Sequence, residues 1–474
     1  MLPKPVAVAS SSNPVYTIGV YILMGCIFLI YSRAVDFIAV PGIALVLVVL
    51  VLLATGIVGD VKSTFKMPTT RWICLYMAWL PVTILFSIWR GGSFTIFVNH
   101  AFHAALIYVS IVSLVTTRKV MNTVVGTIAL ANLFICVMGF IGPTHLMQER
   151  LVIGYGTFGD PNALAMYLLF GLPCWWLWAQ RLPILLRIFP IGAVCLTLMV
   201  FGKTGSRGGM IALIAVLGFH FLKVPAAMKA KLLAAVVVFG LAAAVLLPTY
   251  ITLRFMSFFT IADESSPYAA MLKGNDVAST ESREDVAKQA FNLTLQHPLT
   301  GVGMGNFGDS AYSAFKQHGA EFINTATHNS FLQVSSETGI PGFLLFTAMI
   351  ISTLFLKSPG TRRPDLSKGG DIATWDLVTM HYMKLCVVVL CAFAISLSFA
   401  YDDILMIGLA LVVASWNIAN KSAAVNTNAA VAVKLAPTVV RTARPAGFKP
   451  IVQTTPAITP ATARAPRTHH RLRG

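Results

Sequence analysis

The sequence predicts an all-α polytopic membrane protein with about 12 transmembrane helices and one long loop between helices 9 and 10. Three observations support this fold class. Hydrophobic residues make up 56% of the chain and charged residues only 11%, whereas soluble domains carry about 25% charged residues. The mean hydropathy is +0.75. Apolar stretches of membrane-spanning length recur along the chain, and one polar interval among them is much longer than the rest.

The apolar stretches fix the order of the expected elements. They lie at 15–31, 37–59, 71–89, 94–116, 120–141, 161–180, 184–201, 208–222, 230–250, 329–356, 378–400 and 403–419. The chain therefore divides into an N-terminal segment (1–14), helices 1–9 (15–250), a loop (251–327), helices 10–12 (328–420) and a C-terminal tail (421–474). We expect the first stretch to be a retained helix, because no small-residue cleavage site follows it.

The distribution of Lys and Arg predicts the orientation. With the N-terminus inside, the inner segments hold 24 basic residues and the outer segments hold ten. Without the tail and the long loop, to which the positive-inside rule applies poorly, the ratio is 15 to 5. We therefore expect both termini on the inner side and the loop at 251–327 on the outer side.

The net charge of +17 does not indicate nucleic-acid binding. The tail at 421–474 holds nine Lys and Arg residues and no acidic residue, which is about half of the excess charge. Its composition lacks periodicity and predicts a disordered segment that lies along anionic lipid. The seven cysteines all fall in apolar stretches, so no disulfide framework is indicated and we expect small buried side chains.

The outer loop is the one sizeable water-facing segment. Its beginning, at 263–280, is rich in turn-forming residues. A helix is predicted from Ser282 to Leu295, because Ser282 and Asp285 resemble a capping box and Val286, Ala290 and Leu293 share a helical face. The loop is too small for a separate enzyme domain, and we expect it to form a lid over the membrane body.

Arg207 is a candidate anion-binding residue. It opens an apolar stretch in the segment Ser206-Arg207-Gly208-Gly209. A cation is disfavoured at a helix N-terminus. The glycines, however, expose backbone N–H groups, and a phosphate at this position would be bound by the guanidinium and by these N–H groups. The alternative is an arginine that extends to the membrane interface.

His328 is a candidate general base. It stands where the tenth stretch begins, and a helix N-terminus lowers the pKa of a histidine, so the imidazole should be neutral at pH 7. The alternative is a histidine held by local hydrogen bonds. The same stretch is interrupted at Glu337 and at Gly339-Ile340-Pro341-Gly342, about three turns in.

Other polar residues give weaker signals. His100 and His103 have the i, i+3 spacing of metal ligands, but no third ligand is evident, so interhelical hydrogen bonds are the simpler interpretation. Asp402 and Asp403 could pair with Arg207 or Arg283, but an ordinary solvated turn is the simpler interpretation. The glycines at 301, 303 and 305 allow close backbone approach, but neither a strand nor a Lys-Ser/Thr pair flanks them, so nucleotide binding is unsupported.

Four segments in order resemble the O-antigen ligase and O-antigen polymerase family of bacterial membrane glycosyltransferases. They are GTFGDPNALA (156–165), SRGG (206–209), SREDVAKQAF with HPLTGVGMGNF (282–307) and THNSFLQVSSETGIPGFLLF (327–346). The resemblance covers about 155–355. It implies transfer of a glycan from a polyprenyl-diphosphate carrier to a hydroxyl of a glycan, lipid or protein acceptor, in lipopolysaccharide or exopolysaccharide assembly. The reaction would take place at the periplasmic face of the inner membrane, without metal or cofactor.

The resemblance also implies site residues. Arg207, Arg283 and His328 match the family's catalytic positions, and Arg283 is the least certain match because the loop varies in length. Ser206, Gly208, Gly303 and Asn329 lie in the same segments and are expected to bind substrate. Whether the chain is a ligase or a polymerase is not settled by these residues.

A transporter or flippase of lipid-linked oligosaccharides is the alternative function. Twelve helices and arginine-lined cavities suit it, but transporters often show repeated halves with broken helices in both. Here the long loop and the Gly-Pro-Gly break occur only in the second half. A purely structural scaffold would leave Arg207, Arg283 and His328 unexplained.

Overall fold

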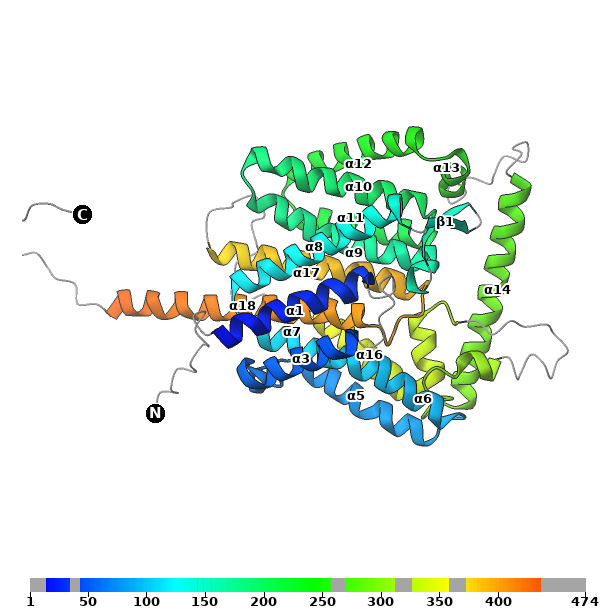
Figure 1. The fold of residues 1–474 in the computed structure, drawn as a ribbon, viewed down its shortest axis with the longest axis horizontal. Coiled ribbons are helices and arrows are strands. Elements are labelled where there is room, and N and C mark those ends of the chain that lie inside the picture. The colour runs from blue at the N-terminus through cyan, green and yellow to red at the C-terminus, as the bar shows by residue number, and fades with distance from the viewer. Residues whose placement is uncertain are drawn as a thin grey trace, which may run out of the picture. The chain divides into compact units, whose positions relative to one another are not determined.

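The computed structural model describes residues 14–34, 43–142, 144–147, 149–154, 156–256, 269–311, 326–357 and 372–435. Residues 1–426 form one compact unit, to which the description below applies, and residues 427–474 form a second. In the first unit the helices run roughly alongside one another (Figure 1).

The first half of the chain contributes helices on both sides of the core. Their bounds are α1 (Pro14–Ser32), α3 (Ile43–Val58), α4 (Val61–Thr64), α5 (Thr70–Leu85), α6 (Arg90–Ile96), the π-helix η1 (Phe97–Phe102), α7 (His103–Leu114), α8 (Arg118–Ile141), the 3₁₀ turns η2 (Gly156–Gly159) and η3 (Ile184–Arg187), α9 (Pro161–Arg181) and α10 (Ile188–Lys203). α9 packs against α8, α10 and α17, so it lies at the centre of the bundle.

The second half completes the bundle and carries the outer loop. Its elements are α11 (Arg207–Lys223), α12 (Ala226–Leu246), α13 (Thr249–Met256), α14 (Ala269–Gln296), α16 (Ser330–Leu354), α17 (Ile372–Ala394) and α18 (Asp403–Leu435). A helix lies at each of the twelve predicted stretches, and nine spans in the described residues are long and apolar enough to cross a membrane. The chain is thus all-α and consistent with a multi-pass membrane protein.

One short sheet departs from the all-helical expectation. β1 (Thr144–Met147) and β2 (Arg150–Ile153) form an antiparallel hairpin between α8 and α9, with Thr144 opposite Ile153. β2 is buried and β1 is exposed. The hairpin lies at the same end of the bundle as α13 and α14 (Figure 1), and we call this end the loop end.

Two boundaries of the sequence analysis are wrong. α14 begins at Ala269, so part of the segment expected to be turn-rich is helical, and Ser282 lies inside the helix instead of capping it. The remainder of the turn-rich segment lies outside the described residues. α18 continues to Leu435, so residues 421–435 are helical where a disordered tail is predicted. Cys74 and Cys195 are exposed on their helices, not buried.

The predicted apolar face of the loop helix is confirmed. Val286, Ala290 and Leu293 are buried and pack with Val302, Phe307, Ala311 and Leu332. Thr294 also donates a hydrogen bond to Ser335 Oγ over 3.1 Å. The end of α14 is therefore fixed to the first turns of α16. Whether the rest of the loop forms a lid concerns residues that lie partly outside the described ranges.

The break in α16 is confirmed, and the glycine segment of the loop explains it. Gly339 has φ +74° and ψ −178°, so the helix is kinked there. Pro341 cannot donate to the Glu337 carbonyl, and Gly303 N–H donates to it over 2.9 Å instead. In return, Ile340 N–H donates to the Pro298 carbonyl over 2.8 Å. A Cβ on Gly301 would lie 2.3 Å from the Glu337 carbonyl carbon, so the two backbones meet only because glycine is present.

Candidate active site

Arg207 lies at the first turn of α11, directly after a tight turn. Ser206 caps the helix, and its Oγ accepts a hydrogen bond from Gly209 N–H over 3.1 Å. Gly205 has φ +56°, which the turn requires. The expectation that Gly209 exposes a bare N–H is therefore wrong. The glycines serve packing, because a Cβ on Gly208 would lie 2.6 Å from Ser396 Oγ and one on Gly209 would lie 2.5 Å from the Phe201 ring.

Two buried arginines hold the turn in place. Arg150, at the start of β2, donates from Nε to the Thr204 carbonyl over 2.8 Å. Arg254, in α13, donates from Nε to the Gly205 carbonyl over 3.0 Å. Both side chains are almost fully buried, at 9% and 7% exposure. Charged groups are costly to bury unless they are hydrogen-bonded, and these two use consecutive carbonyls of one turn.

The start of α9 joins the same network. Arg150 Nη2 and Ser206 Oγ both donate to Asn162 Oδ1, each over 2.8 Å. Asp160 caps α9 by accepting from Asn162 N–H over 2.8 Å. The segment that holds Asp160 and Asn162 is thereby fixed beside the segment that holds Arg207.

His328 precedes the N-cap of α16 and has a left-handed backbone, with φ +49°. Its neighbour Asn329 caps the helix, accepting from the N–H groups of Phe331 and Leu332 over 2.9 and 3.0 Å. Non-glycine residues rarely adopt this backbone conformation, although histidine does so more often than most. The imidazole itself is half-buried. Strained backbone conformations of this kind are common at functional sites.

The segment between α17 and α18 connects the starts of α11 and α16. Ser330 Oγ donates to the Leu397 carbonyl over 2.7 Å, and Asn329 Nδ2 donates to the Ile395 carbonyl over 3.3 Å. The same segment contributes Ser396, against which Gly208 packs. Residues 395–397 therefore contact both elements that carry predicted catalytic residues.

The charges of this region act on one another. Burial is the largest cause that lowers the pKa of Arg283, and the charge of Arg207 is the next. Arg283 is exposed at its surface, so water screens this effect and its direction alone is informative. Burial and the charge of Arg254 lower the pKa of Arg150 to about 10. Each of the four guanidinium groups therefore lies within electrostatic reach of another.

His328 belongs to the same cluster. Burial lowers the pKa of His328, the charge of Arg283 lowers it further, and Asp160 acts in the opposite direction. The imidazole is therefore neutral at pH 7 and can accept a proton. We call His328, Asp160 and the four arginines (Arg150, Arg207, Arg254, Arg283) the loop-end cluster.

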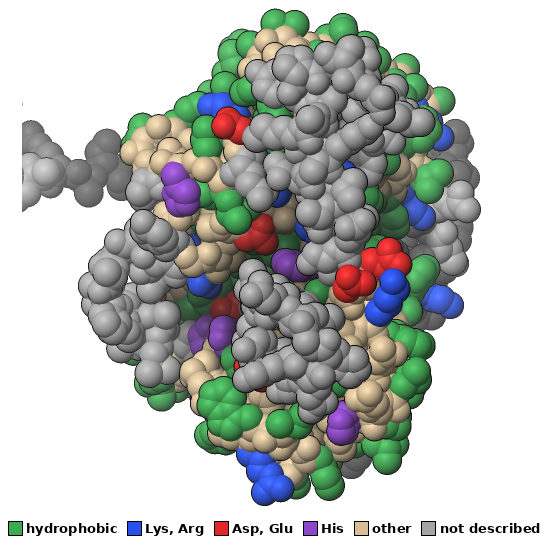
Figure 2. Space-filling model, turned by 90° about the vertical axis from the view of Figure 1, so that its right-hand side faces the viewer, with side chains coloured by type: hydrophobic (Ala, Val, Ile, Leu, Met, Phe, Trp, Pro, Cys, Tyr) green, Lys and Arg blue, Asp and Glu red, His purple; other side chains and the backbone are tan. Residues whose placement is uncertain are grey.

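The face that carries this cluster is hollowed. Figure 2 shows histidine, acidic and basic side chains around a depression near the middle of the loop end. The structure thus brings Arg207, Arg283 and His328 together at one end of the bundle. Among the other predicted residues, Ser206 and Asn329 are helix caps, Gly208 packs on Ser396, and Gly303 N–H is bonded to Glu337. Their part in substrate binding stays a prediction.

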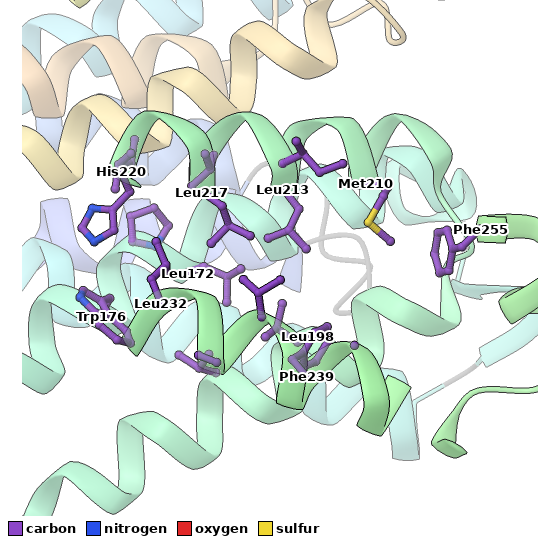
Figure 3. A pocket seen from close by; sticks show the side chains of 18 of the residues that line it. Leu172, Trp176, Leu198, Met210, Leu213, Leu217, His220, Leu232, Phe239 and Phe255 are labelled. Atoms are coloured by element: carbon purple, nitrogen blue, oxygen red, sulfur yellow. The ribbon is translucent and has the colours of Figure 1, made fainter. Parts of the chain in front are cut away.

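An apolar cavity of about 480 Å³ begins next to the cluster. Met210 lies one turn after Arg207, and Phe255 follows Arg254; both line the cavity at one end, and His220 and Trp176 line it at the other (Figure 3). The remaining walls come from α9, α10, α11, α12, α13 and α17, largely as leucine, valine and phenylalanine side chains. The cavity therefore runs along α11 from the loop end into the bundle.

The weaker candidates lie elsewhere. His103 contacts Asp403 over 2.8 Å, which confirms an interhelical hydrogen bond for that histidine. The expectation of a solvated turn at Asp402 and Asp403 is wrong. Asp403 is only 18% exposed in its pair with His103, and burial raises the pKa of Asp402 to about 6. Asp403 thus pairs with a histidine and not with Arg207 or Arg283.

Arg150 and Arg254 were not singled out from the sequence, and Asn162 entered only as part of the segment at 156–165. A signal for the two arginines was available, because both lie in outer segments, where the positive-inside rule predicts few basic residues. Four of the ten outer Lys and Arg residues belong to the loop-end cluster. Asn162 carried no such signal, since its role depends on where α9 and α11 meet.

Comparison with known proteins identifies one family. The family described as O-antigen ligase matches residues 191–347, which include α11, α14 and the first turns of α16. This confirms the family resemblance drawn from the sequence and covers Arg207, Arg283 and His328. No curated protein matches the chain.

Proposed function

We propose that this chain, which belongs to the O-antigen ligase family through residues 191–347, transfers a glycan from a polyprenyl-diphosphate carrier to an acceptor hydroxyl. The family supports polysaccharide assembly by glycosyl transfer in general. The donor, the acceptor, the metal-independent chemistry and the roles of individual residues are our proposal.

The observation that carries the proposal is the loop-end cluster. Four arginines lie within electrostatic reach of their neighbours beside one neutral, half-buried histidine. Like charges at this spacing repel, so the cluster favours an anion of more than one charge. A diphosphate has that charge, and guanidinium groups bind its oxygens in a bidentate manner.

The chemistry follows from these groups. The acceptor oxygen forms a bond to the anomeric carbon while the bond between that carbon and the diphosphate oxygen breaks. His328 takes the proton of the acceptor hydroxyl. Arg207 and Arg283 stabilise the negative charge that develops on the leaving diphosphate. A single displacement of this kind inverts the anomeric configuration.

Arg150 and Arg254 support the site through the backbone. Each bonds a carbonyl of the turn before Ser206 and Arg207, and each adds positive charge behind it. We assign them the positioning of Arg207 and a share of the field that attracts the diphosphate. Ser206, Gly208, Gly303 and Asn329 are proposed to line the substrate path.

The apolar cavity suits the carrier lipid. It starts at Met210 and Phe255, next to two arginines of the cluster, and its walls are apolar (Figure 3). A polyprenyl chain there would lie among α9, α10, α11 and α12 while its diphosphate meets the guanidinium groups. Membrane lipid thus surrounds the protein, and the lipid-linked donor reaches the site from within the membrane.

The charge distribution supports a site at the periplasmic face of the bacterial inner membrane. Basic residues are concentrated in the segments at the opposite end of the bundle, which predicts N-in and C-in orientation. The acceptor is a growing glycan in a polymerase, or a lipid or protein in a ligase.

The test uses protein purified in detergent with a polyprenyl-diphosphate-linked oligosaccharide and EDTA. Release of polyprenyl diphosphate and the size of the glycan are followed for the wild type, His328→Ala and the control His145→Ala, whose side chain is exposed on β1. Transfer by the wild type and the control, but not by His328→Ala, supports the proposal. A ladder of products indicates a polymerase, and one shifted product indicates a ligase. Donor that is bound but never consumed, with acceptors present, favours the lipid transporter.

A further inference from the structure

A second cavity, of about 400 Å³, lies at the end of the bundle opposite the loop end. It is formed where α8 begins, α9 ends and α17 passes α18. Its polar wall includes Arg118, Arg181 and Asp376, and its apolar wall consists of Met121, Trp375 and Ile418. The volume is within the range of about 300–1,000 Å³ that is usual for small-ligand sites.

The two arginines of this cavity differ in their partners. Arg118 is bound in a bidentate manner by Asp376, with Nη2 to Oδ2 at 2.7 Å, and Nη2 also donates to Ser422 over 2.9 Å. Arg181 instead donates to two neutral groups, Asn122 Oδ1 and Thr379 Oγ1, the latter over 3.0 Å. Among the described residues, Arg181 forms no ion pair.

The charges of the cavity therefore do not cancel. Two guanidinium groups and one carboxylate leave a net charge of about +1 at pH 7. Asp376 is only 4% exposed and forms its ion pair with Arg118; its charge also acts on Arg181, but one carboxylate cannot balance two guanidinium groups. Asn122, which lines the cavity and contacts Arg181, is exposed, so a ligand can approach Arg181 past this side chain.

The position of the cavity limits the kinds of ligand that it can bind. The cavity lies at the ends of candidate membrane spans, since α8 begins at Arg118 and α9 ends at Arg181, and tryptophan favours the membrane–water level at which such ends are expected. Basic cavities between transmembrane helices bind anionic lipid head groups. An apolar wall opposite one uncompensated guanidinium fits a group with a single negative charge and attached carbon chains.

We propose that this cavity binds one phosphate group, with Arg181 as its principal contact. The group is carried by an acidic phospholipid or by a soluble phosphate ester. The site is separate from the loop-end cluster and does not depend on the proposed glycosyl transfer. Its ligand would join α8, α9, α17 and α18 at this end of the bundle.

The test measures thermal unfolding of delipidated full-length protein in detergent. Dioleoyl phosphatidylglycerol, dioleoyl phosphatidylcholine, glycerol 3-phosphate and inorganic phosphate are added separately. The variants are Arg181→Gln and Arg187→Gln, the latter altering an exposed arginine in η3, outside the cavity lining. At about tenfold excess over Kd, a specific ligand should raise the midpoint by about 2–4 °C.

We expect phosphatidylglycerol to raise the midpoint of the wild type and of Arg187→Gln but not of Arg181→Gln. The same pattern with glycerol 3-phosphate or inorganic phosphate also supports the site and identifies a soluble source. An equal rise in all three proteins, or no rise with any of the probes, overturns the proposal.

A second variant covers the case in which Arg181→Gln does not fold. Asn122→Trp places a bulky ring at the exposed opening and leaves both arginines in place. It should abolish the rise as well, and native mass spectrometry should show loss of the bound lipid or phosphate. Retention of the ligand by Asn122→Trp would also overturn the proposal.

Discussion

The two ends of the bundle both carry arginines, but they balance them differently. At the loop end, Arg150 and Arg254 bond backbone carbonyls, and neighbouring guanidinium groups lower the pKa of Arg150 and Arg283. In the second cavity, at the opposite end, Arg118 is paired with buried Asp376, whereas Arg181 donates to the neutral groups Asn122 and Thr379.

The difference shows that backbone and side-chain acceptors have different effects on the charge of an arginine. A carbonyl satisfies the hydrogen bonds of a guanidinium without cancelling its charge, whereas a carboxylate does both. The loop end thus preserves positive charge, which suits the proposed diphosphate. In the second cavity, the Arg118–Asp376 pair uses its charges to hold α8 and α17 together. The predictions below test this contrast in order of expected effect.

The largest effect should come from His328. His328→Ala removes the proton acceptor, so the transfer rate should fall by about 10²–10⁴, the usual contribution of general base catalysis. Donor binding should persist, because the arginines remain. The measurement is polyprenyl-diphosphate release under single turnover. His381→Ala, a change of a buried histidine in α17, should leave the rate within a few-fold, and an equal loss in both would contradict the assignment.

Replacing arginine by lysine should lower activity at the loop end and lower stability at the opposite end. Arg207→Lys keeps the charge but loses the planar fork, so transfer should fall by about 10²-fold. Arg118→Lys should leave the rate unchanged and lower the unfolding midpoint, because its partner is Asp376. Rates and thermal unfolding are measured for both variants. If Arg118→Lys were the inactive one, the assignment of chemistry to the loop end would be wrong.

Removing one carboxylate from each end should have different consequences. Asp376→Asn breaks the pair with Arg118 and should destabilise the protein by about 1–3 kcal/mol. Asp160→Asn retains a good N-cap for α9, so its unfolding free energy should change by less than about 0.5 kcal/mol. Denaturant unfolding in detergent measures both. Equal losses of stability would show that Asp160 is as structural as Asp376.

The smallest effect should be a shift in pH dependence. As a base, His328 acts in its neutral form, and its pKa is lowered from 6.5. Transfer should therefore fall as the pH drops, but at a lower pH than for a histidine with the ordinary pKa. Arg283→Gln removes one cause of the lowering, so the fall should begin at a higher pH. Rate profiles of Arg283→Gln and the opposite-end control Arg181→Gln are compared, and a shift toward lower pH in Arg283→Gln would refute the coupling.

The sequence predicted the helices well because each one had to be apolar over a fixed length. It also singled out Arg207 and His328 as ionisable residues at the ends of apolar stretches, and Arg283 through the family resemblance. It did not predict that residues 395–397 join α11 to α16, or that β2 carries Arg150 into the site. Those contacts depend on tertiary packing and have no local pattern. The break in α16 was predicted from its glycines and proline, but the contact of this break with the glycine segment of the loop was not.

The joint between the loop and α16 has a consequence for how the protein is made. In lipid, a carbonyl without a donor costs several kcal/mol, and the Glu337 carbonyl depends on Gly303 because Pro341 has no N–H. In the proposed orientation, the broken part of α16 can therefore be stable in the membrane only after residues 297–307 have been translocated. The ribosome delivers those residues before α16. Synthesis thus produces the loop segment before α16, which is the order that insertion of α16 requires.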